Sequence, residues 1–155
     1  MTTQLDQPKP WGSAIGTILT FLVLGPPLGA IVLVLLLAAV PGLALTTAFE
    51  GKGIADLLAG SIGVMLFTLP FSYILGGLQA GFCGLVLATY GWFKGRPPLW
   101  IALVASLFAF GVSYFVDIFG TFADSQHITM VMFITHMVPT FLCWLIVRNY
   151  WRARD

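Results

Sequence analysis

The sequence of 155 residues contains very little charge. Only 8% of its residues are Asp, Glu, Lys or Arg, seven basic and six acidic, whereas soluble globular domains usually carry about 25%. So few charges cannot cover a water-facing surface, and intrinsic disorder is excluded because it requires low hydrophobicity and high charge. The net charge of +1 provides no basic stripe for phosphates, so we expect no nucleic-acid partner.

Reactive and metal-binding residues are also scarce. The two cysteines are too few for a secreted disulfide scaffold. The chain has two histidines, and its few carboxylates fall in the expected loops. These residues do not form a recognisable metal-binding pattern. The sequence contains no CxxC, HExxH, GxGxxG, P-loop or nucleophile-elbow motif. We therefore predict no catalytic residues, no metal site and no enzymatic activity.

Apolar residues make up 59% of the chain, and the charges divide it into four long uncharged stretches. About 20 helical residues cross the hydrocarbon core of a bilayer. The composition therefore predicts an all-α integral membrane protein, a four-transmembrane-helix bundle whose first partner is the lipid bilayer. The uncharged stretches are residues 10–49, 57–93, 97–116 and 125–147, and the expected spans are about 13–40, 71–92, 98–117 and 128–148.

The first two stretches are too long for single straight spans, and proline indicates where they deviate. We predict a kink at Pro26 and Pro27 in the first span and another at Pro70 in the second, while Pro139 interrupts the fourth. A re-entrant turn at Gly25-Pro26-Pro27 is the alternative for the first stretch. The apolar arm at residues 57–69 would either lie along the membrane interface or extend the second helix.

The positions of Lys and Arg predict the orientation in the membrane. With four spans, six of the seven basic residues lie on one side, and only Lys52 lies on the other. Basic residues are enriched on the cytoplasmic side, so both short termini are expected in the cytoplasm. Tyr150 and Trp151 are expected to anchor the fourth span at that interface. The compact chain, rich in Leu, Ala and Gly, favours a bacterial inner membrane.

Two polar residues remain inside the expected spans, His136 and Gln79. No carboxylate, lysine or arginine lies near the membrane midplane, which disfavours an ion-coupled transporter. His136 follows His127 by about 13 Å of helix and can be a haem ligand or a neutral side chain bonded to a neighbouring helix. A bis-histidine haem would need a second copy of His136, because His127 lies on the opposite face. We therefore predict no cofactor.

Small residues surround Gln79 in the second span. The pairs Gly77-x-x-x-Gly81 and Gly84-x-x-x-Ala88 allow close approach of helices. We interpret Gly77, Gly81 and Gly84 as a helix-packing seam in which Gln79 forms an interhelical hydrogen bond. A flexible hinge that lines a path is the alternative.

These features predict a protein that acts through helix packing. We expect an accessory or assembly subunit, or a homo-oligomer, whose partner is another membrane protein or a second copy of itself. A small oligomeric transporter or channel for an uncharged substrate is the alternative. A haem- or quinone-associated membrane protein that uses His136 is the second alternative.

Overall fold

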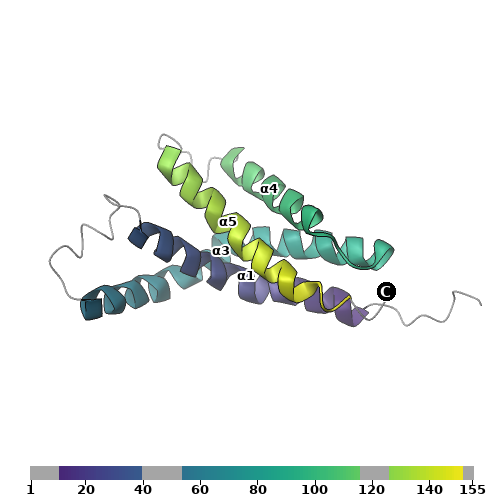
Figure 1. Cartoon of the computed structure of the whole chain (residues 1–155), viewed down its shortest axis with the longest axis horizontal. Coiled ribbons are helices and arrows are strands. Elements are labelled where there is room, and N and C mark those ends of the chain that lie inside the picture. Colours follow the sequence, from purple (N-terminus) through teal and green to yellow (C-terminus); the bar gives the residue numbers. More distant parts are fainter. Residues whose placement is uncertain (1–10, 40–53, 116–125, 152–155) are drawn as a thin grey trace, which may run out of the picture.

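A computed structural model describes residues 11–39, 54–115 and 126–151 of the chain. All regular secondary structure within these ranges is α-helical, and all labels follow Figure 1. The helices are α1 (Trp11–Ala39), α3 (Ile54–Lys94), α4 (Leu99–Phe115) and α5 (Gln126–Val147). The predicted all-α class is therefore confirmed for this part of the chain.

Three of these helices are long and apolar enough to cross a membrane. The qualifying segments are Trp11–Leu36 in α1, Ser72–Lys94 in α3 and Thr129–Val147 in α5. The fourth, α4, is apolar but has only 17 residues. Because a helix satisfies its own backbone hydrogen bonds, apolar helices are suited to the bilayer interior. The structure is thus consistent with an integral membrane protein.

The prolines lie inside continuous helices. Helix α1 runs through Pro26 and Pro27 without a turn, so it does not form the re-entrant hairpin considered above. Helix α3 has 41 residues and runs through Pro70, which makes the arm at residues 57–69 a part of this helix. Such a helix is about 60 Å long, roughly twice the thickness of the hydrocarbon core. The first span is expected to end at residue 40 and the third at residue 117. Both positions lie outside the described residues.

The helices pack as a closed ring. In order around the ring, α1 contacts α3, α3 contacts α4, α4 contacts α5 and α5 contacts α1. Figure 1 shows α1 crossing α3 near its middle, with α5 passing over this crossing. This arrangement directs the inner faces of all four helices toward one another.

Small residues permit the close approach of α1 and α3. A Cβ atom on Gly84 would lie 3.0 Å from Phe21 Cβ and 3.2 Å from the backbone of Ile18. A Cβ atom on Gly25 would lie 3.0 Å from Ala80 Cβ. Between helices in a bilayer, van der Waals packing replaces the hydrophobic driving force, so such contacts matter for association.

The buried core is built mainly from alanine and other small side chains, with a few large residues at one end. The largest fully buried side chain is Trp151, whose indole Nε1 donates a hydrogen bond to Thr17 Oγ1 at 3.1 Å. Trp151 therefore packs inside the bundle, and the expected interfacial anchor is incorrect for this residue. The core cluster contains Ala14, Phe21, Cys83, Leu87, Ala88, Ala102, Ala105, Ala109, Cys143, Val147 and Trp151.

A tight turn joins α3 to α4 at the same end of the molecule. Gly95 follows the last residue of α3 with a φ of 82°, and its N–H donates to the Gly91 carbonyl at 3.0 Å. This is the left-handed glycine cap that ends many helices. Pro97 lies just beyond, and its carbonyl accepts a hydrogen bond from Trp144 Nε1 at 3.0 Å. The turn is thereby fastened to α5.

Candidate functional site

Three helices are joined by a chain of side-chain hydrogen bonds that centres on Gln79 of α3. The Gln79 side-chain oxygen pairs with Nε2 of His136 from α5, and its amide nitrogen donates to Ser113 Oγ of α4. The Ser113 hydroxyl in turn donates to the Ala109 carbonyl at 3.0 Å. The structure therefore brings together the two polar residues singled out in the sequence, which are 57 positions apart.

Both ring nitrogens of His136 face carbonyl oxygens. Nδ1 donates to the Met132 carbonyl at 2.9 Å, and Nε2 faces the Gln79 oxygen, which can only accept. A neutral imidazole carries one N–H, which Nδ1 uses here, so Nε2 requires a donor. Rotation of the Gln79 amide by half a turn lets its nitrogen donate to Nε2. The Gln79 oxygen then faces Ser113 Oγ, and it accepts from Ser113 only if that hydroxyl turns away from the Ala109 carbonyl. Gln79 can thus pair with the neutral imidazole of His136.

Further contacts fix the position of His136. The Phe110 ring meets the imidazole edge to face, with 5.4 Å between ring centroids. Thr140 donates to the His136 carbonyl at 2.9 Å and is 3.1 Å from Ser106 Oγ of α4. Aromatic and hydroxyl contacts of this kind restrict both the ring and the backbone around it. His136 is therefore a held side chain and not a freely moving one.

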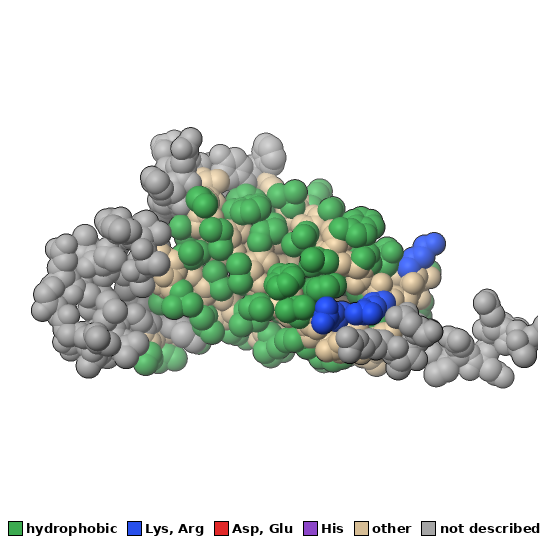
Figure 2. Space-filling model, in the orientation of Figure 1, with side chains coloured by type: hydrophobic (Ala, Val, Ile, Leu, Met, Phe, Trp, Pro, Cys, Tyr) green, Lys and Arg blue, Asp and Glu red, His purple; other side chains and the backbone are tan. Residues whose placement is uncertain are grey.

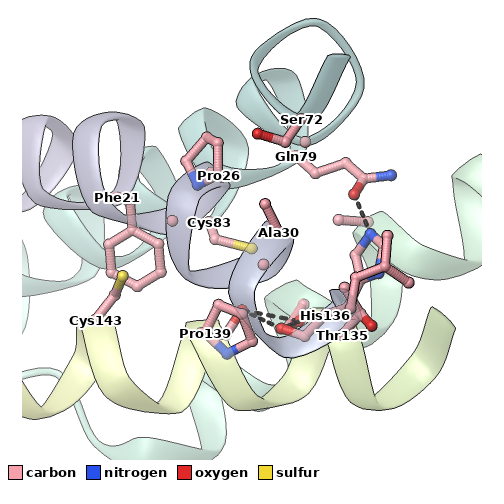
Figure 3. A pocket seen from close by; sticks show the side chains of 18 of the residues that line it. Phe21, Pro26, Ala30, Ser72, Gln79, Cys83, Thr135, His136, Pro139 and Cys143 are labelled. Carbon is pink, nitrogen blue, oxygen red and sulfur yellow. Dashed lines mark hydrogen bonds between the residues drawn. The ribbon is translucent and has the colours of Figure 1, made fainter. Parts of the chain in front are cut away.

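A half-open pocket of about 230 Å³ lies between the four helices beside this hydrogen-bonded chain. Figure 3 shows Gln79 and His136 forming one side of the space, with Ala30 and Cys83 opposite and Pro139 below. Its walls are mostly apolar, and all four helices contribute to them. Largely apolar pockets with a few converging polar groups are the usual form of small-molecule sites.

Proline leaves backbone carbonyls without their helical partner near this pocket. Pro27 has no N–H for the Val23 carbonyl, and the Tyr73 hydroxyl of α3 supplies the missing donor at 2.9 Å. Pro139 likewise has no N–H for the Thr135 carbonyl, and Thr135 lines the pocket. Pro139 thus leaves the Thr135 carbonyl without its backbone donor in an apolar environment, whereas the Val23 carbonyl has regained a donor.

The other residues singled out in the sequence are distributed as follows. Pro26 and Pro139 line the pocket, whereas Pro27 and Pro70 do not. A Cβ atom on Gly81 would lie 3.1 Å from the Leu22 side chain of α1, so this glycine and Gly84 face α1. A Cβ atom on Gly77 would have nothing within 4 Å outside its own helix.

Sequence reasoning missed several pocket residues, including both cysteines. Cys83 and Cys143 are buried, unbridged and in the pocket wall. Both lie in the same half of their expected spans, which allows a contact between them, but the sequence gives no signal that they share a pocket. The hydroxyls of α4 did carry a signal, because Ser106 and Ser113 are seven residues apart and so lie on one helix face. Both belong to the hydrogen bonds around His136.

Within residues 11–39, 54–115 and 126–151, no three His, Cys, Asp or Glu side chains are placed to hold a metal ion. The basic side chains of these ranges are Lys94, Arg96 and Arg148. Figure 2 shows the basic side chains together at one end of the molecule, with apolar side chains covering the visible face beyond them. Such an arrangement separates a polar end from an apolar body.

Comparisons of the chain with protein-family models, with curated proteins and with solved structures found no match.

Proposed function

We propose that this protein binds an uncharged, mostly apolar molecule from the bilayer in the pocket between its four helices, without catalysing a reaction. The observation that carries the proposal is the pocket itself, which joins apolar walls to the hydrogen-bonded pair of Gln79 and His136. A polar side chain fixed by hydrogen bonds at the wall of an apolar pocket can orient a ligand and distinguish between ligands of similar shape. The bilayer would deliver such a ligand to the half-open side.

The chemistry of the walls supports an uncharged ligand. None of the residues that line the pocket is Asp, Glu, Lys or Arg. A charged ligand would lose its hydration there and would find no opposite charge, at a cost of several kcal/mol. An apolar ligand that enters from the lipid has no hydration shell to lose, so it does not incur this cost.

Methionine provides a direct test. Met132 lines the pocket, whereas Met130 on the same helix is 64% exposed on the outer surface. With methionine methyl groups labelled with carbon-13, a titration of the protein in nanodiscs with naphthalene should shift the Met132 resonance saturably. An aromatic probe that merely dissolves in the lipid would shift Met130 and leave Met132 unchanged, and this result would refute the proposal.

A blocked pocket gives the matched control. A Cβ atom on Gly76 would have nothing within 4 Å outside its own helix, and Gly76 lines the pocket. Gly76→Leu should therefore fill the space and abolish the saturable Met132 shift. Gly77→Leu places the same side chain one residue away, where the pocket wall does not extend, and should leave the titration intact.

A role as an accessory or assembly subunit, or as a homo-oligomer, is the second proposal. It is supported by the long helix α3, whose exposed side chains include Ile62, Leu66 and Phe67 in the half before Pro70. Native mass spectrometry after extraction in a mild detergent tests it. Complexes with a second copy or another membrane protein are expected, and a lone monomer would count against this role.

Two alternatives make different predictions. Transport of an uncharged substrate by an oligomer requires flux into proteoliposomes, beyond binding alone. Haem association would require His136 Nε2 to leave Gln79, and an absorbance spectrum of the purified protein near the Soret band tests it. The hydrogen bonding of both ring nitrogens favours a ligand without a metal over a haem.

The finer topology is also proposed. We infer four membrane spans, with both termini on the cytoplasmic side of a bacterial inner membrane. The gathering of the visible basic side chains toward one end of the molecule (Figure 2) supports this orientation. Fusion of a periplasm-active and a cytoplasm-active reporter to each terminus tests it, and cytoplasmic activity is expected at both. Periplasmic activity at one terminus would exclude an even number of spans.

A further inference from the structure

Two hydroxyls of the pocket wall, those of Ser72 and Thr135, have already donated their only hydrogen. Ser72 donates its hydroxyl hydrogen to the Leu69 carbonyl at 2.7 Å, and Thr135 donates its own to the Val131 carbonyl at 2.8 Å. A serine or threonine hydroxyl has one hydrogen and two acceptor sites. Both oxygens are thus left with lone pairs, and the described hydrogen bonds bring no donor to either of them.

The backbone adds another acceptor on the same wall. Because Pro139 lacks an N–H, the Thr135 carbonyl has lost its usual helical donor. Thr135 therefore contributes two acceptor oxygens at one position of the pocket wall. Among the lining side chains, Gln79 retains the second of its two amide hydrogens as a donor, since Ser113 takes only one.

We propose that the ligand of this pocket is an apolar alcohol or phenol whose hydroxyl donates to the acceptors of Thr135. This inference rests on the proposed binding function and specifies its ligand class. A ligand hydroxyl can donate its hydrogen to Thr135, and its oxygen keeps lone pairs that can accept from another donor. A ketone or an ether can only accept, and it would leave the Thr135 oxygens facing another lone pair.

The volume sets the size of the group that enters. An engineered apolar cavity of about 150 Å³ binds benzene, so a pocket of about 230 Å³ accommodates a bicyclic ring or a chain of comparable size. A longer apolar tail would extend through the half-open side into the lipid. 1-Naphthol is therefore a suitable probe, and 1-methylnaphthalene has nearly the same shape without a donor.

The test compares three probes at the Met132 methyl group, with concentrations expressed per lipid so that partitioning into the bilayer cancels. 1-Naphthol should bind about five- to tenfold more tightly than 1-methylnaphthalene or 1-methoxynaphthalene, as expected for one added hydrogen bond. Equal affinities for the three probes would overturn the inference and leave the binding function standing. Failure of all three to shift Met132 would instead refute the binding function.

Variants of Thr135 identify the acceptor. Thr135→Val keeps the shape of the side chain but removes its oxygen, and it should reduce the preference for 1-naphthol. Thr135→Ser restores the oxygen and should restore the preference. Pro139→Ala returns an N–H to the Thr135 carbonyl and should also weaken 1-naphthol selectively. If Thr135→Val and Pro139→Ala both retain the full preference, the assignment to Thr135 is wrong.

Discussion

The effect of a substitution in this bundle depends on how much space the packing leaves around the residue. Gly91 of α3 is the extreme case, because an added Cβ would lie 2.6 Å from Cζ2 of the Trp151 ring. The ring is fully buried and its Nε1 is bonded to Thr17, so it cannot move aside freely. By contrast, a Cβ on Gly111 would have nothing within 4 Å outside its own helix.

Gly91→Ala should therefore lower the unfolding temperature of the protein in detergent. The expected cost of overpacking is about 1–3 kcal/mol, which exceeds the gain of up to about 1 kcal/mol that alanine brings to a helix. Gly111→Ala, where only the helical gain applies, should keep or raise the unfolding temperature. Equal effects of the two substitutions would show that the contact with Trp151 does not limit this position.

A second prediction concerns the hydrogen bond from Tyr73 to the Val23 carbonyl at 2.9 Å. Tyr73→Phe should destabilise the protein by about 1 kcal/mol, because the carbonyl loses the donor that replaces the missing N–H of Pro27. In a Pro27→Ala background the backbone donor is restored, so the same substitution should cost much less. A double-mutant cycle measured by unfolding in detergent tests this coupling, and additive effects would contradict it.

At the scale of the element, depth in the bilayer separates positions with similar exposure. On α3, Leu78 is 82% exposed and Phe93 is 76% exposed. Leu78 lies well inside the segment Ser72–Lys94, whereas Phe93 lies next to its end. Both side chains are apolar and point away from the bundle, so the structure of the monomer alone treats them alike. The two positions differ in their expected depth in the bilayer, since Leu78 would lie in the hydrocarbon region and Phe93 near the interface.

Leu78→Arg should reduce the yield of inserted protein, because an arginine near the middle of a span costs about 2.5–3.5 kcal/mol on insertion scales. Phe93→Arg should have little effect, since its long side chain can extend to the interface beside Lys94. The membrane-inserted fraction of each variant gives the measurement. A similar loss for both would mean that Ser72–Lys94 does not cross the bilayer in this register.

At the scale of the whole molecule, the pocket couples ligand binding to stability because all four helices within the described residues contribute to its wall. A ligand that binds only the folded bundle stabilises it by RT ln(1 + [L]/Kd), about 2.7 kcal/mol at one hundred times Kd. Saturating 1-naphthol should therefore raise the unfolding temperature of the unmodified protein. The filled-pocket variant Gly76→Leu should show no such rise, and an equal rise in both would indicate an effect of the probe on the detergent.

The sequence by itself determined the apolar, all-helical class of the protein and indicated where helices form. Charges are excluded from the hydrocarbon region and a helix satisfies its own backbone groups, so long uncharged stretches become helices whatever their neighbours are. Helices α4 and α5 overlap the stretches that this local rule marked as helical, residues 98–117 and 128–148. The same rule also marked His136 and Gln79 as the polar residues of the interior. It did not settle that α3 is one helix of 41 residues, because proline permits either a break or a continuous helix.

Only the tertiary structure decided which residues meet. In a bilayer the surroundings of a helix are as apolar as its contacts, so hydrophobic periodicity does not reveal which face is inside. The pairing of His136 with Gln79, the burial of Trp151 and the grouping of both cysteines around one pocket depend on helix rotation and register. These are set by close contacts such as those of Gly84 and Gly25, whose partners lie far away in the sequence.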